Sequence, residues 1–109
     1  MKLKFPKEIT IGDMVFTVKT NPKSAGGNFS YPFKSGDKAT IEIGTKHLKM
    51  MPTRVLSIII HELKEIINVE QSVRFSRMDE EDNFEFHYTH KEHTDMCSRL
   101  AGLLNAFLK

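Results

Sequence analysis

Three side chains that could bind a metal ion or move a proton, His61, Glu62 and Glu65, lie within five consecutive residues. On a helix, residues i and i+4 face the same side with Cβ atoms about 5–6 Å apart, so His61 and Glu65 can reach one ion. The same geometry makes H-E-x-x-H a zinc motif in which the glutamate is the general base. Glu62 occupies the position of that base, and Glu65 stands where the second histidine would be.

A third ligand has to come from elsewhere, because a catalytic zinc ion typically has three protein ligands and one open position. The chain has a second group of histidines at His87, His90 and His93. His93 falls on the apolar stripe of the predicted C-terminal helix, which favours an inward side chain, and it is our first candidate. A set of His61, Glu65 and His93 has the two histidines and one glutamate that H-E-x-x-H metallopeptidases with a distal glutamate use. His90 and His87 stay open as alternatives.

Simpler interpretations exist for each of these residues. Glutamates on helices usually face water, so Glu62 and Glu65 also fit a solvated face with Lys64 beside them. His61 also fits a partly buried histidine with no ligand. Cys97 lies one turn beyond the last histidine and could be a soft ligand, although we expect a buried structural cysteine.

The elements that must position these residues follow from hydrophobic periodicity and turn chemistry. Residues 9–18 predict a β-hairpin, because Gly and Asp lie between two β-rich segments. Residues 21–37 predict a long loop whose aromatic residues fold back onto the core more often than they line a cleft. Residues 39–43 alternate in hydrophobicity and predict a strand at the edge of the sheet.

Two helices are predicted after that strand. Residues 53–70 have apolar positions at helical spacing, with Thr53 as the N-cap. Residues 72–88 alternate on both sides of an acidic turn and predict an inserted hairpin. Thr89 and Glu92 form a capping-box pattern at the start of a last helix. Its apolar face contains Met96, Leu100, Leu103, Leu104 and Phe107.

The composition indicates one soluble domain covering residues 1–109. The chain has 39% hydrophobic and 28% charged residues, and the irregular order of strands and helices is typical of the α+β class. A net charge of +2 gives no argument for a nucleic-acid partner. No apolar segment is long enough to span a bilayer, so we expect no membrane partner. A single cysteine and the lack of a signal-peptide pattern predict a cytoplasmic location.

The arrangement resembles the small zincin-type metallopeptidase-like proteins that bacteriophages and prophages encode. The resemblance covers most of the chain, and its specific part is the helix segment LSIIIHEL at residues 56–63. It implies a bound Zn²⁺, His61 as a ligand, Glu62 as general base, and a peptide or protein substrate lying against residues 40–43. The chain departs from the family pattern at Glu65, which leaves a catalytically inactive structural or interaction protein as the alternative.

Overall fold

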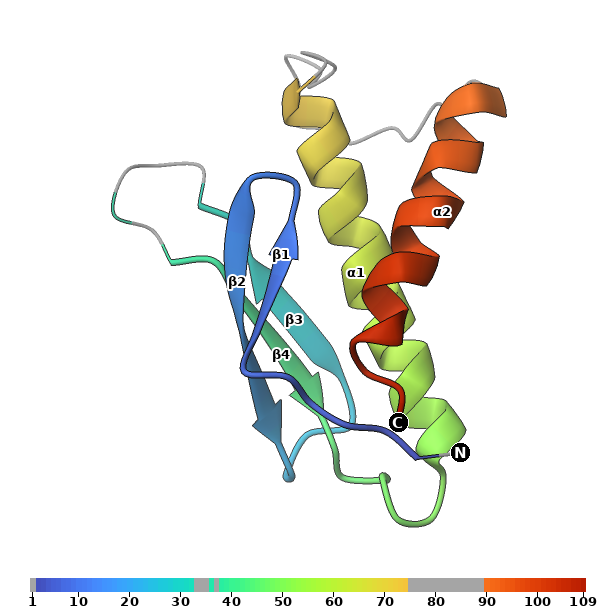
Figure 1. The fold of residues 1–109 in the computed structure, drawn as a ribbon. Helices are drawn as coiled ribbons and strands as arrows, with labels where there is room; N and C mark the ends of the chain where they lie inside the picture. Colours follow the sequence, from blue (N-terminus) through green and yellow to red (C-terminus); the bar gives the residue numbers. More distant parts are fainter. Residues whose placement is uncertain (1, 33–35, 37, 75–89) are drawn as a thin grey trace.

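The structure, a computed structural model, describes residues 2–32, 36, 38–74 and 90–109. Four strands come first and two helices follow, so the described part of the chain is an α+β domain. The strands form one mixed sheet, and the two helices pack side by side against one of its faces (Figure 1). None of the described helices is both long enough and apolar enough to cross a membrane.

The N-terminal hairpin is confirmed as β1 (Glu8–Ile11) and β2 (Met14–Asn21), which pair antiparallel. Alternate residues of the hairpin point into the core, where Ile11 and Phe16 are completely or almost completely buried. Gly12 begins the turn with φ of +63°, a left-handed conformation that glycine adopts without steric cost. The hairpin was predictable because its alternation and its turn residues are both local features.

The sheet contains a strand that the sequence did not predict. Within the expected loop of residues 21–37, β3 (Gly27–Ser30) pairs antiparallel with β4 (Thr40–Gly44), and β4 pairs parallel with β2. The strand order is β1-β2-β4-β3, so β4 is an inner strand, and β1 and β3 are the two edge strands. The prediction that residues 39–43 form an edge strand was therefore wrong. β3 is short and glycine-containing, and main-chain pairing with β4, which local sequence does not reveal, defines it.

The aromatic residues of that segment fold back onto the core, as expected, at two of three positions. Phe29 and Tyr31 are partly buried against the core cluster, and the ring of Tyr31 lies 6.1 Å from the ring of Phe16. Phe33 lies outside the described residues.

The central helix, α1 (Pro52–Arg74), is longer than predicted at both ends. It begins at Pro52, a residue whose fixed φ suits the first helical turn, so Thr53 lies within that turn and is not the N-cap. Its apolar face is confirmed, with Ile59, Leu63 and Ile66 fully buried. Residues 72–74, expected to begin the inserted hairpin, are helical, which corrects that prediction, and residues 75–89 lie outside the described part of the chain.

Contacts with the C-terminal helix, α2 (His90–Asn105), explain why α1 continues. Glu70, the last residue of the predicted helix, and Gln71, the first residue beyond it, are both buried. The carboxylate of Glu70 accepts a hydrogen bond from Arg99 at 3.0 Å, and the amide of Gln71 donates one to Asp95 at 3.4 Å. The predicted apolar face of α2 is confirmed, since Met96 is buried and the three leucines pack against the core. Phe107, which lies just beyond the end of α2, is also buried.

Candidate functional site

His61 and Glu65 lie together on the exposed side of α1, near the middle of the helix. The Nε2 atom of His61 is 2.6 Å from Oε1 of Glu65, and their side chains are 64% and 42% exposed. This contact follows from their i, i+4 spacing on one helical face. Two donors in this arrangement can bind the same ion, and their role as metal ligands stays a prediction.

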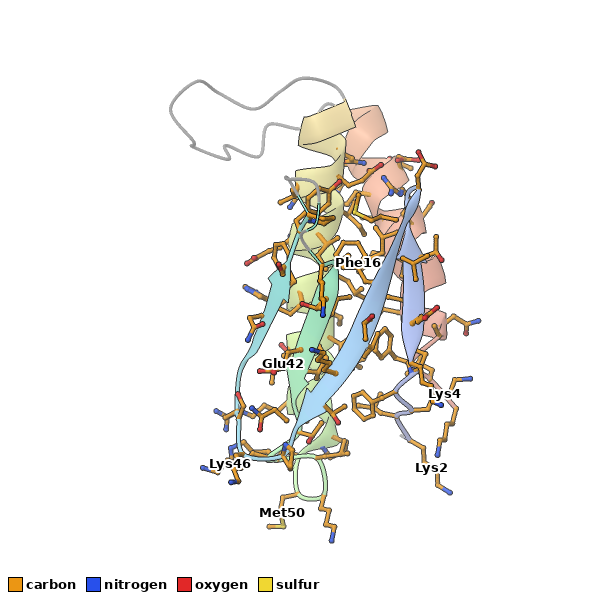
Figure 2. The ribbon with its side chains drawn as sticks, turned by 90° about the vertical axis from the view of Figure 1, so that its left-hand side faces the viewer. Lys2, Lys4, Phe16, Glu42, Lys46 and Met50 are labelled. Carbon is orange, nitrogen blue, oxygen red and sulfur yellow. The ribbon has the colours of Figure 1, made fainter. Side chains whose placement is uncertain are left out.

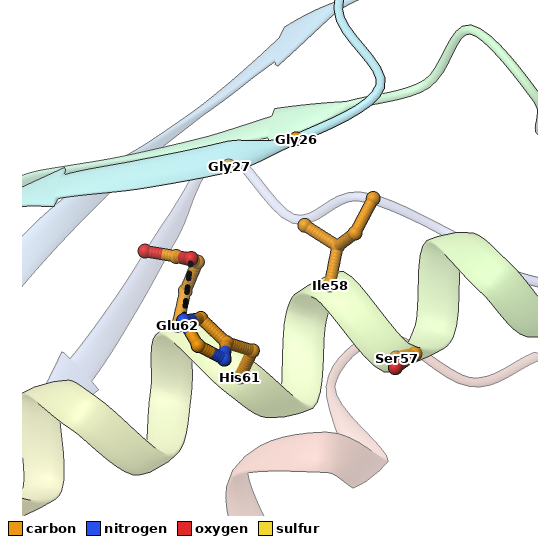
Figure 3. A pocket seen from close by; sticks show the side chains of 6 residues that line it. All are labelled: Gly26, Gly27, Ser57, Ile58, His61 and Glu62. Atoms are coloured by element: carbon orange, nitrogen blue, oxygen red, sulfur yellow. Dashed lines mark ion pairs between the residues drawn. The ribbon is translucent and has the colours of Figure 1, made fainter.

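Glu62 lies beside this pair but faces the interior of the fold. The residue is only 5% exposed, and its Oε2 atom is 3.8 Å from Nε2 of His61 (Figure 3). Burial is the main cause that raises the pKa of the Glu62 carboxyl above its usual value. The nearby charge of Glu65 raises this pKa further, and His61 opposes the shift. A carboxyl group with a raised pKa, next to candidate metal ligands, is suited to accept and return a proton.

A groove of about 310 Å³ runs between α1 and the beginning of β3. One wall is the chain around Gly26 and Gly27, and the other is the helix surface (Figure 3). The helix contributes Ser57, Ile58, His61 and Glu62 to the lining. The groove therefore places the start of β3 opposite His61 and Glu62.

Gly27 allows β3 to approach α1 this closely. A Cβ atom at position 27 would lie 2.7 Å from Cγ2 of Ile58 and 3.1 Å from Cγ of Glu62. Distances below 3.0 Å are not tolerated without movement, so any larger residue would push the strand away from the helix. Sequence reasoning missed this residue. The available signal was the Gly26-Gly27 pair, since glycine in a strand often marks a close approach of the backbone to a neighbour.

His93 is not brought to the other candidate ligands. It lies on the exposed surface of α2, where its Nε2 atom is 3.7 Å from Sγ of Cys97, so the prediction of an inward side chain was wrong. The two helices run antiparallel, and Gln71 of α1 faces Asp95 of α2. His61 lies ten residues before Gln71, which corresponds to about 15 Å along the helix axis at 1.5 Å per residue. Cys97 is also exposed, which corrects the expectation of a buried cysteine.

The remaining candidate ligands can be placed only in part. His90 is the first residue of α2, and His87 lies outside the described residues. Among the described residues, no group of three or more His, Cys, Asp or Glu side chains could hold a metal ion. His61 and Glu65 thus fit two of the three protein ligands that a catalytic zinc ion commonly has.

The separation of His61 and Glu65 is compatible with a shared ion after a small movement. Two ligands that bind a tetrahedral zinc ion at about 2.0–2.1 Å are about 3.3 Å apart. The observed 2.6 Å separation would therefore have to open by about 0.7 Å, which a rotation of two exposed side chains can supply.

Comparison of this chain with protein-family models, with curated proteins and with solved structures finds no match.

Proposed function

We propose that this protein is a metal-dependent, peptidase-like hydrolase of the phage type that its sequence resembles. The observation that carries the proposal is the convergence of His61 and Glu65 at 2.6 Å beside the buried Glu62, at the side of a groove. Each of the three residues has a distinct task in such an enzyme. The chemistry is that of peptide-bond hydrolysis by an activated water molecule.

His61 and Glu65 would hold the metal, and Zn²⁺ is the ion that their nitrogen and carboxylate donors suit. When bound, the ion supplies Lewis acidity and lowers the pKa of a coordinated water. A metal ion binds to a neutral imidazole and to an ionised carboxylate, so it competes with protons for both donors. We therefore expect metal affinity to fall at acidic pH.

Glu62 is the proposed general base. Its carboxyl lies on the groove side of α1, with Oε2 3.8 Å from Nε2 of His61, and the residue as a whole is buried. Because its pKa is raised, the carboxyl binds a proton more readily than an ordinary glutamate, which favours taking up a proton from water and then passing it to the leaving amine. A fully exposed glutamate with an ordinary pKa would be a weaker base. It would also be a poorer proton donor near neutral pH, because less of it is protonated there.

The proposed substrate is an extended peptide that lies in the groove along β3. An inner strand such as β4 has both of its edges paired, so the substrate position implied by the family resemblance moves from residues 40–43 to the edge strand. The backbone of an edge strand presents hydrogen-bonding groups to an added strand. The open space on the groove lies beside Gly26, where a Cβ atom would meet nothing within 4 Å, so the substrate would approach Glu62 from that side.

The metal content of the purified protein tests the ligands. Zinc measured by mass spectrometry should be near stoichiometric in the wild type, lost in His61→Ala and Glu65→Ala, and retained in Glu62→Gln. Alanine substitutions at His87, His90 and His93 identify the third ligand, and the position of His93 in the structure predicts that His93→Ala keeps the metal. Equal zinc in wild type and His61→Ala would refute the site.

Turnover tests the base separately. A mixture of unstructured peptides, analysed by mass spectrometry after incubation with the zinc-loaded protein, should show cleavage by the wild type. Glu62→Gln should reduce this cleavage by at least about 100-fold, the usual contribution of a general base, while its zinc content is unchanged. Full activity in Glu62→Gln would contradict the mechanism even if the metal site is correct.

A second candidate function is a metal-free module that binds a peptide segment of a partner protein. The observation that favours it is that no third donor joins His61 and Glu65 among the described residues. In that case the edge of β3 binds a partner by strand addition without cleaving it. A melting temperature that is unchanged by chelator and by added zinc would support this module over the hydrolase.

A further inference from the structure

One end of the molecule collects positive charge from segments that are far apart in the sequence. We define this cationic end by seven exposed residues: Lys2, Lys4, Lys23, Lys46, Lys49, Arg54 and Lys109. The chain termini, the turn between β2 and β3, and the loop between β4 and α1 all lie there (Figure 1). Figure 2 shows Lys2, Lys4, Lys46 and Met50 at this same end. Two backbone hydrogen bonds join the segments, from Lys46 to Ser24 at 3.1 Å and from Lys109 to Lys2 at 3.3 Å.

Acidic residues are missing from the segments that build this end. Residues 1–7, 14–36 and 43–61 contain no Asp or Glu. The net charge of +2 hides this separation, because the first 54 residues contain ten Lys and Arg against four Asp and Glu. The first turn of α1, which also lies at this end, has no acidic residue to offset the positive end of the helix dipole.

Two methionines project from the middle of these charges. Met50 is 85% exposed and Met51 is 43% exposed, in the loop that also carries Lys46 and Lys49. Met50 lies at the tip of the molecule in Figure 2, pointing away from the core. Most of its apolar surface therefore contributes nothing to the packing of the fold, and a flexible unbranched side chain of this kind can enter an apolar phase.

We propose that the cationic end docks reversibly on a membrane surface that contains anionic lipids, with Met50 entering the interface between headgroups and acyl chains. A bilayer offers both chemistries that this end displays, negative headgroups for the lysines and an apolar layer for the methionines. A nucleic-acid backbone would satisfy the lysines but leave the methionines in water. This surface is separate from the groove, and the proposal does not depend on the hydrolase.

Vesicle sedimentation tests the proposal with the full chain. We expect binding to phosphatidylcholine vesicles with about one-third phosphatidylserine, and none to pure phosphatidylcholine. Each cation near such a surface strengthens binding about fivefold, so Lys46→Glu with Lys49→Glu should weaken it by at least about 25-fold. Lys38→Glu with Lys64→Glu is the matched control, because both lysines are exposed, lie outside the cationic end and change the net charge equally. This control should weaken binding far less.

The methionines separate a membrane from other anionic partners. Met50→Gln with Met51→Gln should weaken vesicle binding about tenfold, since two apolar side chains no longer leave water. The same double variant should bind double-stranded DNA as weakly as the wild type does. The proposal is overturned if the wild type does not bind anionic vesicles at roughly 0.15 M salt. It is also overturned if the methionine variant binds them unchanged, or if DNA binds more tightly than the vesicles do.

Discussion

Replacing Gly27 with alanine tests the close approach of β3 to α1. The added methyl group would meet Cγ2 of Ile58 at 2.7 Å, where about 3.4 Å or more is needed, and would also crowd Glu62 and the backbone oxygen of Glu42 at 3.1 Å. Cγ2 is bonded to the branched Cβ of Ile58, close to the helix backbone, so it cannot swing aside. The strand therefore has to retreat by about 0.7 Å or more, which distorts its pairing with β4.

The magnitude follows from measured costs of overpacking, about 1–3 kcal/mol for one added methyl group. Taking about 2 kcal/mol and about 4–8 °C per kcal/mol for a domain of this size, we expect the melting temperature of Gly27→Ala to fall by roughly 8–16 °C. Thermal and urea denaturation followed by circular dichroism measure both quantities. The movement of β3 should also change the shape of the groove beside Glu62, so metal-dependent turnover should fall together with stability.

Gly26→Ala is the matched control, because a Cβ atom at position 26 meets no atom within 4 Å. Both substitutions reduce the entropy of the unfolded chain equally, so their difference isolates the contact in the folded state. Ile58→Ala provides a second check, since it removes the clashing methyl group. Gly27→Ala and Ile58→Ala together should be less destabilising than the sum of the two single variants. If Gly27→Ala is as stable as Gly26→Ala, the described approach of strand and helix is incorrect.

Three other predictions concern stability and reactivity. Glu62→Gln should stabilise the protein near neutral pH but not below about pH 4.5. Because the pKa of Glu62 is raised in the folded state, the folded protein keeps this proton to higher pH than the unfolded chain, so wild-type stability falls as the pH rises through that pKa. Urea titrations at several pH values should show this fall in the wild type and not in the variant. Arg99→Met should destabilise by about 3 kcal/mol, because Glu70, with a side chain only 8% exposed, loses its ion pair; adding Glu70→Gln should recover part of the loss in urea unfolding, and no recovery would argue against the pair. Cys97 should react with a thiol reagent in the native protein without a lag, and a reaction that requires denaturant would contradict its exposed position.

Local patterns predicted the elements that depend on local physics. The hairpin around Gly12 and the apolar face of α1 were both found from residues that interact with near neighbours in the sequence. The proximity of His61 and Glu65 belongs to this group, because four residues on one helix fix their separation whatever the fold around them.

Features that depend on distant partners were not predictable. β3 exists because β4 pairs with it, and the last turns of α1 persist because Glu70 and Gln71 contact α2. His93 was misplaced for the same reason: helical spacing from Met96 put it near the apolar stripe, but the register of α1 against α2 decides where it lies. That register brings His93 to the end of α1 that is remote from His61.

The distribution of charge was likewise not visible in the composition. A net charge of +2 gave no argument for a nucleic-acid partner, and it also did not show that the fold gathers lysines from the N-terminus, two loops and the C-terminus at one end. The three-dimensional distribution of charge, which sets the local potential, is not a property of the composition.

The edge position of β3 has a consequence for the dynamics of the groove. β1 and β3 are both four-residue edge strands, but β1 buries Ile9 and Ile11 whereas no residue of β3 is fully buried. β3 therefore has the fewer interactions to break, and it can detach in a local fluctuation while the other three strands stay folded. We expect the amides of residues 27–30 to exchange with deuterium faster than those of β2 and β4. The wall facing Glu62 is thus the part of the sheet that opens most readily, so a segment too bulky for the resting groove gains access without global unfolding.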